Sequence, residues 1–139
     1  KFSDGITNAS MLCFYANVGN AEQQEKMRSH CERILDKCNY GFPSWDPEHK
    51  SFDKIRYWRG PVWLIMNHMI SKGLLECGFD KPAHRIMNDT RMLVEKAGMA
   101  EYFDPMEGRP LGGQNFSWTA AIYLEMNSAD VSEDNINRV

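Results

Sequence analysis

Apolar residues recur at helical spacing in five separate stretches of the chain. Their spacing predicts helices over residues 4–17, 21–38, 61–77, 81–97 and 117–126. Apolar side chains surround the first, third and fifth of these helices, whereas the second and fourth carry a single apolar stripe. A helix that is apolar on every side is buried on every side, and a one-sided helix shields it from water. The pattern therefore indicates alternating inner and outer helices, as in a layered α/α toroid or solenoid.

The residues at the helix ends agree with these boundaries. Asn20 is a good N-cap, Pro61 and Pro82 suit first turns, and Gly78 and Gly98 follow helix ends. The sequence has no repeat at the period of a helical hairpin and no alternating strand pattern of useful length. We therefore predict an all-α fold, and the sequence does not support a solenoid of near-identical units.

Three inner helices need more cover than two outer helices provide. We expect either that the chain is a piece of a larger barrel or that copies of it associate through exposed inner-helix faces. We expect such a contact to bury Leu64, Ile65, Ile122 or their neighbours. Residues 127–139 are mostly polar, and we expect them to form a C-terminal tail that frays.

The charge and hydrophobicity of the sequence argue against nucleic-acid and membrane partners. The 139 residues carry a net charge of −3, and 42% of them are hydrophobic, as in ordinary soluble globular domains. Because the sequence lacks a basic stripe, we expect no nucleic-acid partner. Because it lacks a run of about 18 apolar residues, we expect no membrane partner. The chain begins with Lys1 rather than Met, so we expect a fragment whose missing N-terminus would carry any targeting signal.

The cysteines and histidines show no metal-binding spacing. The four cysteines form no CxxC pair, and Cys31 and Cys38 lie on one face of a predicted helix. We interpret the cysteines as buried, reduced thiols, which favours a reducing compartment such as the cytoplasm. We predict that the protein uses neither a metal nor a cofactor.

Two long loops, residues 39–60 and 98–116, are rich in aromatic, proline and glycine residues. Loops of this length inside a compact domain are usually functional. Both connect an outer helix to an inner one, so they should emerge at the same end of the helix layer. This topology places residues 57–59 near Glu101 and Gln114. An aromatic surface with a carboxylate suits carbohydrate, because the C–H faces of sugar rings stack on aromatic side chains.

Three motifs lie in and beside these loops. They are Tyr57-Trp58-Arg59-Gly60-Pro61-Val62-Trp63 with Asn67 and Gly73-Leu74, Glu101-Tyr102-Phe103-Asp104-Pro105 with Gly108 and Gly112, and Phe116-Ser117-Trp118-Thr119-Ala120-Ala121. In this order they resemble the C-terminal part of the (α/α)6-barrel glycoside hydrolases of family 63, with mannosylglycerate and glucosylglycerate hydrolases nearer than trehalases. The resemblance implies that residues 1–126 are the C-terminal segment of such a catalytic domain. It also implies a partial (α/α)6 toroid of about five helices.

The same resemblance implies an inverting hydrolase that acts on a small α-glycoside or an oligosaccharide. In this mechanism one carboxylic acid protonates the glycosidic oxygen, and a carboxylate about 6.5–9.5 Å away activates water. The resemblance assigns the water-activating role to Glu101. The general acid of the family is an Asp further upstream, which nothing in this sequence matches; Asp4 belongs to a different element. We therefore expect the chain alone to be nearly inactive.

The expected partner is a small carbohydrate held by aromatic rings, amides and a guanidinium group. Of Tyr57 and Trp58, we expect one to face the substrate and the other to pack under the loop. Arg59 either binds a substrate carboxylate or anchors the loop to a backbone carbonyl or to Asp104. The full set of substrate-binding candidates is Tyr57, Trp58, Arg59, Trp63, Asn67, Gln114 and Trp118.

Several of these candidates also have a structural interpretation. Trp63 and Trp118 suit packing in the core, and Asn67 suits a cap on the long loop as well as it suits a hydroxyl ligand. For the whole chain the alternatives are a non-catalytic helical domain that binds carbohydrate or a protein, and a structural helical repeat.

Overall fold

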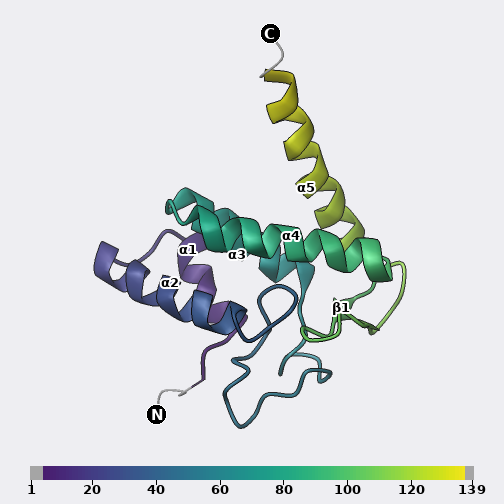
Figure 1. Ribbon diagram of the computed structural model, residues 1–139, viewed down its shortest axis with the longest axis horizontal. Coiled ribbons are helices and arrows are strands. Elements are labelled where there is room, and N and C mark those ends of the chain that lie inside the picture. Colours follow the sequence, from purple (N-terminus) through teal and green to yellow (C-terminus); the bar gives the residue numbers. More distant parts are fainter. Residues whose placement is uncertain (1–4, 137–139) are drawn as a thin grey trace.

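A computed structural model describes the backbone of residues 5–136 and the side chains of residues 5–128. Within this range the regular elements are mostly helices, as predicted, and they are drawn in Figure 1. They are the 3-10 helix η1 (Asn8–Met11), the helices α1 (Leu12–Tyr15), α2 (Ala21–Leu35), α3 (Leu64–Glu76), α4 (Asp80–Ala97) and α5 (Ser117–Ile136), and the two-residue strands β1 (Tyr102–Phe103) and β2 (Pro110–Leu111).

The predicted start of the third helix at Pro61 is wrong. Val62 is extended and exchanges two backbone hydrogen bonds with Phe103, at 2.8 and 3.0 Å, so it is bound to the other long loop instead of joining α3. Trp63 is the N-cap of α3 in an extended conformation. The inner-helix assignment therefore holds for α3, but Trp63 lies before the helix and not on it.

The ends of the chain also differ from the predicted boundaries. The first predicted helix is reduced to η1 and α1, and its predicted start at Asp4 lies outside the described residues. At the other end, α5 continues from Met126 to Ile136 where we predicted a frayed tail. This continuation has a local cause, since residues 127–136 contain neither glycine nor proline to stop a helix.

Helix α3 is the centre of the packing, in contact with α1, α4 and α5. It approaches α1 so closely that a Cβ atom on Gly73 would lie 2.2 Å from the backbone nitrogen of Tyr15. Ile70 and Leu74 on α3 are fully buried together with Phe14. A second buried cluster, which includes residues of α3, α4 and α5, surrounds Phe103.

Two of the three residues that we expected on an exposed inner face are buried within the chain. Leu64 and Ile122 both belong to the cluster around Phe103. Among the side chains of α5 up to residue 128, the large apolar ones that are exposed are Trp118 and Leu124. The uncovered apolar face therefore does not include Leu64.

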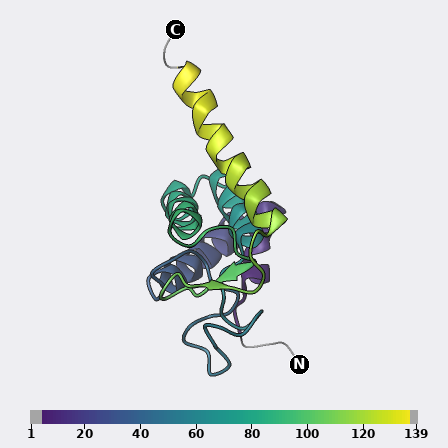
Figure 2. The ribbon, with the colours of Figure 1, turned by 90° about the vertical axis from the view of Figure 1, so that its right-hand side faces the viewer.

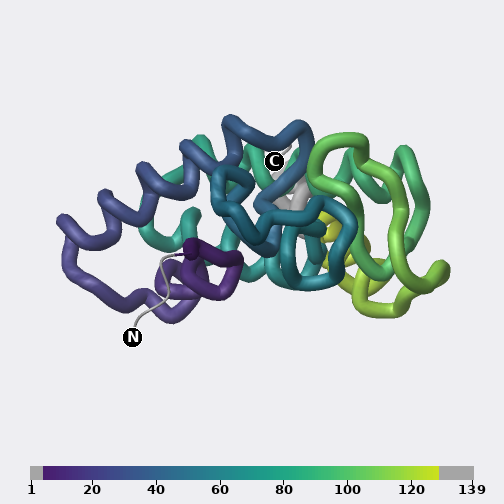
Figure 3. The backbone as a smooth tube through the Cα atoms, turned by 90° about the horizontal axis from the view of Figure 1, so that it is seen from below, coloured from purple at the N-terminus to yellow at the C-terminus, as the bar shows by residue number. Residues whose placement is uncertain are grey.

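The two long loops lie side by side at one end of the helix layer, as the topology predicted (Figure 3). The backbone N–H groups of Asn39 and Tyr40 both donate to the carbonyl of Pro105, at 3.1 and 3.0 Å. The C-terminal end of α5 points away from these loops (Figure 2). The candidate site is formed where these two loops meet.

Candidate active site

The carboxylate of Glu101 lies where the two long loops meet. Its Oε1 accepts a hydrogen bond from the hydroxyl of Tyr57 at 3.1 Å, and its Oε2 accepts one from the backbone N–H of Gly113 at 3.1 Å. The backbone N–H of Glu101 in turn donates to the carbonyl of Gly113 at 2.8 Å. The predicted approach of residues 57–59 to Glu101 is therefore confirmed for Tyr57.

The backbone that carries Glu101 is fixed on both sides of the residue. The Thr119 hydroxyl at the start of α5 donates to the carbonyl of Ala100 at 2.6 Å, and the N–H of Phe116 donates to the carbonyl of Met99 at 2.8 Å. Immediately after Glu101, β1 pairs with β2. The position of the carboxylate is thus set by ordered structure and not by a free loop.

Tyr57 is held in an unusual backbone conformation, with φ of +28°. A left-handed φ is costly for a residue that is not glycine and is retained only where surrounding contacts enforce it. One such contact is the hydrogen bond from the Trp63 indole nitrogen to the Tyr57 carbonyl, at 3.0 Å. Burial and the hydrogen bond to Glu101 raise the pKa of the Tyr57 phenol, so the hydroxyl keeps its proton and acts as the donor.

Three aromatic rings form a stack beside Glu101, and a fourth packs edge-on against them. The rings of Trp58 and Trp63 are nearly parallel with centroids 4.2 Å apart, and Trp63 and Tyr102 follow at 5.0 Å. The ring of Tyr57 meets the other three edge-on. Trp63 is buried in the stack, whereas Trp58 is 44% exposed. Trp58 therefore offers a surface that suits a sugar ring.

Arg59 and Asn67 anchor the loop. The Arg59 Nε donates to the backbone carbonyl of Ser51 at 3.1 Å, which matches the loop-anchoring alternative with a backbone carbonyl as the acceptor. Asn67 is fully buried, and its amide pairs with both the N–H and the carbonyl of Phe42, each at 2.8 Å. This contact supports the cap on the long loop over a hydroxyl ligand.

Gln114 and Trp118, the last two substrate-binding candidates, are both exposed. Gln114 is exposed and directly follows Gly113, whose N–H binds Glu101. Trp118 is 58% exposed on α5, and its ring contact within the described residues is with Phe116, at 5.7 Å. Trp118 also lines an apolar hollow of about 270 Å³ with Ile65, Ala121 and Ile122. The structure does not bring Trp118 into the aromatic stack.

Two contributions to the site were not apparent from the sequence. Gly113, of the Gly112-Gly113 pair, supplies the amide that binds Glu101. Lys54 pairs with both Asp104 and Glu107 and so links the two loops, in the role that we considered for Arg59. The double glycine was the available signal, but only the folded turn shows that its amide faces a carboxylate.

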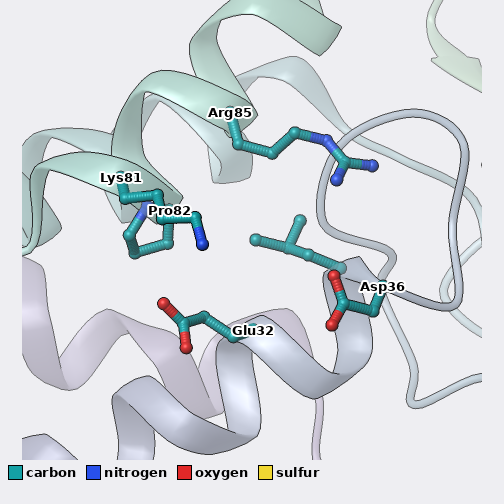
Figure 4. Close-up of a pocket in the computed structure, with 6 residues that line it drawn as sticks. Glu32, Asp36, Lys81, Pro82 and Arg85 are labelled. Carbon is teal, nitrogen blue, oxygen red and sulfur yellow. The ribbon is translucent and has the colours of Figure 1, made fainter.

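A second pocket, of about 150 Å³, lies between α2 and α4 (Figure 4). Glu32 and Asp36 face Lys81 and Arg85 across it, and no aromatic side chain lines it. Arg85 is already engaged with Asp89, at 2.7 Å. This pocket shares no residue with the surface around Glu101, and its composition does not suit a sugar ring.

The described residues show neither a metal cluster nor a membrane helix. Among them, no group of three or more histidine, cysteine, aspartate or glutamate side chains is arranged to hold a metal ion. No helix in that part of the chain is both long and apolar enough to cross a bilayer. All four cysteines are free thiols, and burial raises the pKa of Cys31 and Cys38 to about 12. The prediction that the cysteines are buried is therefore confirmed for Cys31 and Cys38, whereas Cys13 and Cys77 are only half-buried.

A comparison with protein families matches residues 1–119 to the mannosylglycerate hydrolase MGH1-like glycoside hydrolase domain. The chain belongs to this family. It is 42% identical over 124 residues to mannosylglycerate hydrolase MGH1 of Selaginella moellendorffii, which covers 89% of this chain and 25% of the relative. It is 38% identical over 118 residues to mannosylglycerate hydrolase of Thermus thermophilus, covering 85% of this chain and 28% of the relative. The chain thus spans between a quarter and a third of the length of these curated relatives.

Solved structures give the same assignment. The crystal structure of the GH63 mannosylglycerate hydrolase from Thermus thermophilus in complex with glucose superposes with a TM-score of 0.84 and 35% identity, over 88% of this chain and 32% of that one. The same enzyme in complex with Tris and D-glycerate gives 0.85 and 37%, over 87% and 29%. The resemblance to family 63 and the fold class, part of an α/α toroid, are therefore confirmed.

Proposed function

We propose that this chain is the C-terminal part of an inverting glycoside hydrolase that cleaves a small α-glycoside in which the sugar is joined to glycerate. The proposal is supported by the names of the relatives, which are mannosylglycerate hydrolases, and by the aromatic and carboxylate surface at the loop junction. It includes a location in the cytoplasm, for which the free thiols are the support.

The observation that carries the proposal is the two-donor arrangement around Glu101. Each carboxylate oxygen has about two lone-pair positions, and each accepts one protein hydrogen bond, from Tyr57 and from Gly113. One position on each oxygen therefore remains for a water molecule. In the proposed mechanism Glu101 accepts a proton from this water as the water attacks the anomeric carbon. Trp58 stacks on the sugar ring and helps to exclude bulk water.

The general acid is proposed to lie outside this chain. The chain spans only a quarter to a third of its relatives, so most of their residues have no counterpart here. Loss of a positioned acid alone costs about 10²–10⁴ in rate. We therefore expect negligible hydrolysis of mannosylglycerate by the chain on its own, and hydrolysis at ordinary enzyme rates would contradict this part of the proposal.

The test of Glu101 uses the complete enzyme of which we propose this chain to be part. Glu101→Gln keeps the shape of the side chain but cannot accept the proton, so we expect kcat for mannosylglycerate to fall by about 10²–10⁴. Glu95→Gln, the same change on the exposed face of α4, is the control and should leave kcat unchanged. Full activity of the Glu101→Gln enzyme would overturn the assignment.

A non-catalytic carbohydrate-binding domain is the second candidate function, and the exposure of Trp58 favours it. On this alternative the chain alone binds the glycoside without cleaving it. Because the first proposal also expects no cleavage by the chain alone, hydrolysis of mannosylglycerate by the complete protein distinguishes the two. Isothermal titration calorimetry of the chain with mannosylglycerate, before and after Trp58→Ala, measures whether binding depends on Trp58. Binding that is lost on substitution, in a complete protein that does not hydrolyse the ligand, would favour this candidate.

A further inference from the structure

Gly112 lies directly against the carboxylate of Glu101. Its φ is +70°, a conformation that glycine adopts without cost and other residues rarely adopt. A Cβ atom at this position would lie 2.6 Å from Oε2 of Glu101, 2.9 Å from the Glu101 Cβ and 2.7 Å from the Tyr102 ring. The first two atoms belong to the proposed base itself, so a side chain here competes with Glu101 for the same space.

Because Gly112 has no side chain, the carboxylate of Glu101 can lie against it, and there its Oε2 reaches the backbone N–H of Gly113. Oε2 accepts this N–H at 3.1 Å, while Oε1 accepts the Tyr57 hydroxyl from the other loop. The ring of Tyr102 occupies the adjoining side and prevents a sideways shift of a new methyl group. The carboxylate therefore has one orientation in which both donors are bound.

We propose that Gly112 is a positioning residue for the proposed base: its missing side chain lets the Glu101 carboxylate lie on the 112–113 turn and bind the Gly113 amide and the Tyr57 hydroxyl at once. This inference rests on the proposed function of Glu101. If Gly112 only shaped the turn, a substitution there would change stability alone. As a positioning residue, its substitution should also displace the Glu101 carboxylate and lower kcat.

The chain offers a matched glycine control. Gly98 has φ of +78°, close to that of Gly112, and a Cβ there would meet nothing within 4 Å. Gly98→Ala thus reproduces the backbone strain of Gly112→Ala without the clash.

The kinetic test compares Gly112→Ala and Gly98→Ala in the complete enzyme with mannosylglycerate as substrate. Because a displacement of about 1 Å at a catalytic group costs about 10²-fold, we expect Gly112→Ala to lower kcat by about 10²-fold. We expect its KM to stay within a few-fold of the wild-type value, since the aromatic stack remains. Gly98→Ala should keep kcat near wild type, even if it lowers the melting temperature as much as Gly112→Ala does.

A second readout needs no activity and uses the 139-residue chain. In a ¹⁵N NMR titration, the Gly113 amide proton should shift as Glu101 ionises, and Glu101→Gln should abolish that shift. Gly112→Ala should also abolish it, whereas Gly98→Ala should retain it. Retention of both the amide shift and wild-type kcat in Gly112→Ala would overturn the inference. If Glu101→Gln instead keeps full activity, the proposed function fails, and the NMR arm alone decides whether Gly112 positions the carboxylate.

Discussion

At the scale of single residues, an ion pair holds the first long loop on α2. The guanidinium of Arg33 binds both carboxylate oxygens of Asp46, at 2.5 and 3.3 Å, and the N–H of Glu48 donates to Asp46 at 3.0 Å. Although burial acts to raise the pKa of Asp46, the hydrogen bonds from Arg33 and Glu48 outweigh it and lower the pKa below its ordinary value. The loop that carries Tyr57 therefore depends on an ionised Asp46.

The sign of the pH dependence follows from this lowered pKa. A carboxyl group with a lowered folded-state pKa contributes stability that is complete above its unfolded pKa of about 3.9 and is lost as the pH falls through the folded value. We expect Asp46→Asn to destabilise the chain by about 1 kcal/mol at about pH 6, because the Arg33 side of the pair is partly exposed to solvent. The difference from wild type should shrink as the pH falls through the lowered folded-state pKa of Asp46.

Urea unfolding of wild type and Asp46→Asn between about pH 2.5 and pH 6 measures this difference. Asp36→Asn, an exposed position after α2, is the control and should give a difference close to zero throughout. A difference between wild type and Asp46→Asn that stays constant across the range would contradict the assigned role of the pair.

Residue roles were predictable from the sequence to different extents. The proximity of Glu101 and Tyr57 followed from the order of the helices, because two loops that leave outer helices must emerge together. The role of Asn67 did not follow, since it depends on the path of the loop at Gly41, where φ is +55° and a Cβ would lie 2.6 Å from the Asn67 Oδ1. Local backbone conformations of this kind are not encoded in the spacing of apolar residues.

At the scale of elements, the close approach of α3 to α1 at Gly73 gives a prediction whose sign is informative. Alanine in place of glycine inside a helix usually stabilises it by about 1 kcal/mol. At Gly73 the new methyl group would lie 2.2 Å from the Tyr15 nitrogen and 2.4 Å from the Phe14 carbonyl carbon, both backbone atoms. We therefore expect Gly73→Ala to destabilise the chain by about 1–3 kcal/mol, as overpacking does.

Chemical denaturation monitored by circular dichroism tests this expectation. Glu76→Ala, at the C-terminal end of α3 and away from the contact with α1, provides the comparison and should change the stability by less than about 0.5 kcal/mol. A Gly73→Ala variant that is as stable as wild type would contradict this expectation. It would mean that α1 and α3 are far enough apart to hold a methyl group at residue 73.

The elements themselves were well predicted where packing and periodicity agree. The single apolar stripe of α4 marked that helix from its start to Gly98. The start of α3 was missed because the tertiary bridge between Val62 and Phe103 overrides the helical signal of Pro61. The sequence could not reveal that bridge, since the two residues lie in different parts of the chain and pair only once the helices are packed.

At the scale of the whole molecule, the hollow lined by Ile65, Trp118, Ala121 and Ile122 is an apolar surface with little cover. In the complete enzyme that we propose, further helices of the toroid would cover it. In the chain alone a second copy would cover the hollow. Our proposal of self-association is therefore kept for Ile65 and Ile122, with their neighbour Trp118 in place of the buried Leu64. The same side chains would thus be covered within one molecule in the complete enzyme, and between two molecules in the chain alone.

We expect the purified chain to be a dimer or larger at micromolar concentration, by light scattering coupled to size exclusion. Trp118→Asp places a charge in the hollow and should shift the chain to a monomer, because an unpaired charge in an apolar contact is costly. Val18→Asp, at another exposed apolar position in the connection between α1 and α2, should leave the assembly intact. A wild-type monomer at micromolar concentration would remove the support for self-association. In the complete enzyme the Trp118→Asp change should lower the melting temperature instead, since there the same face would be covered within one chain.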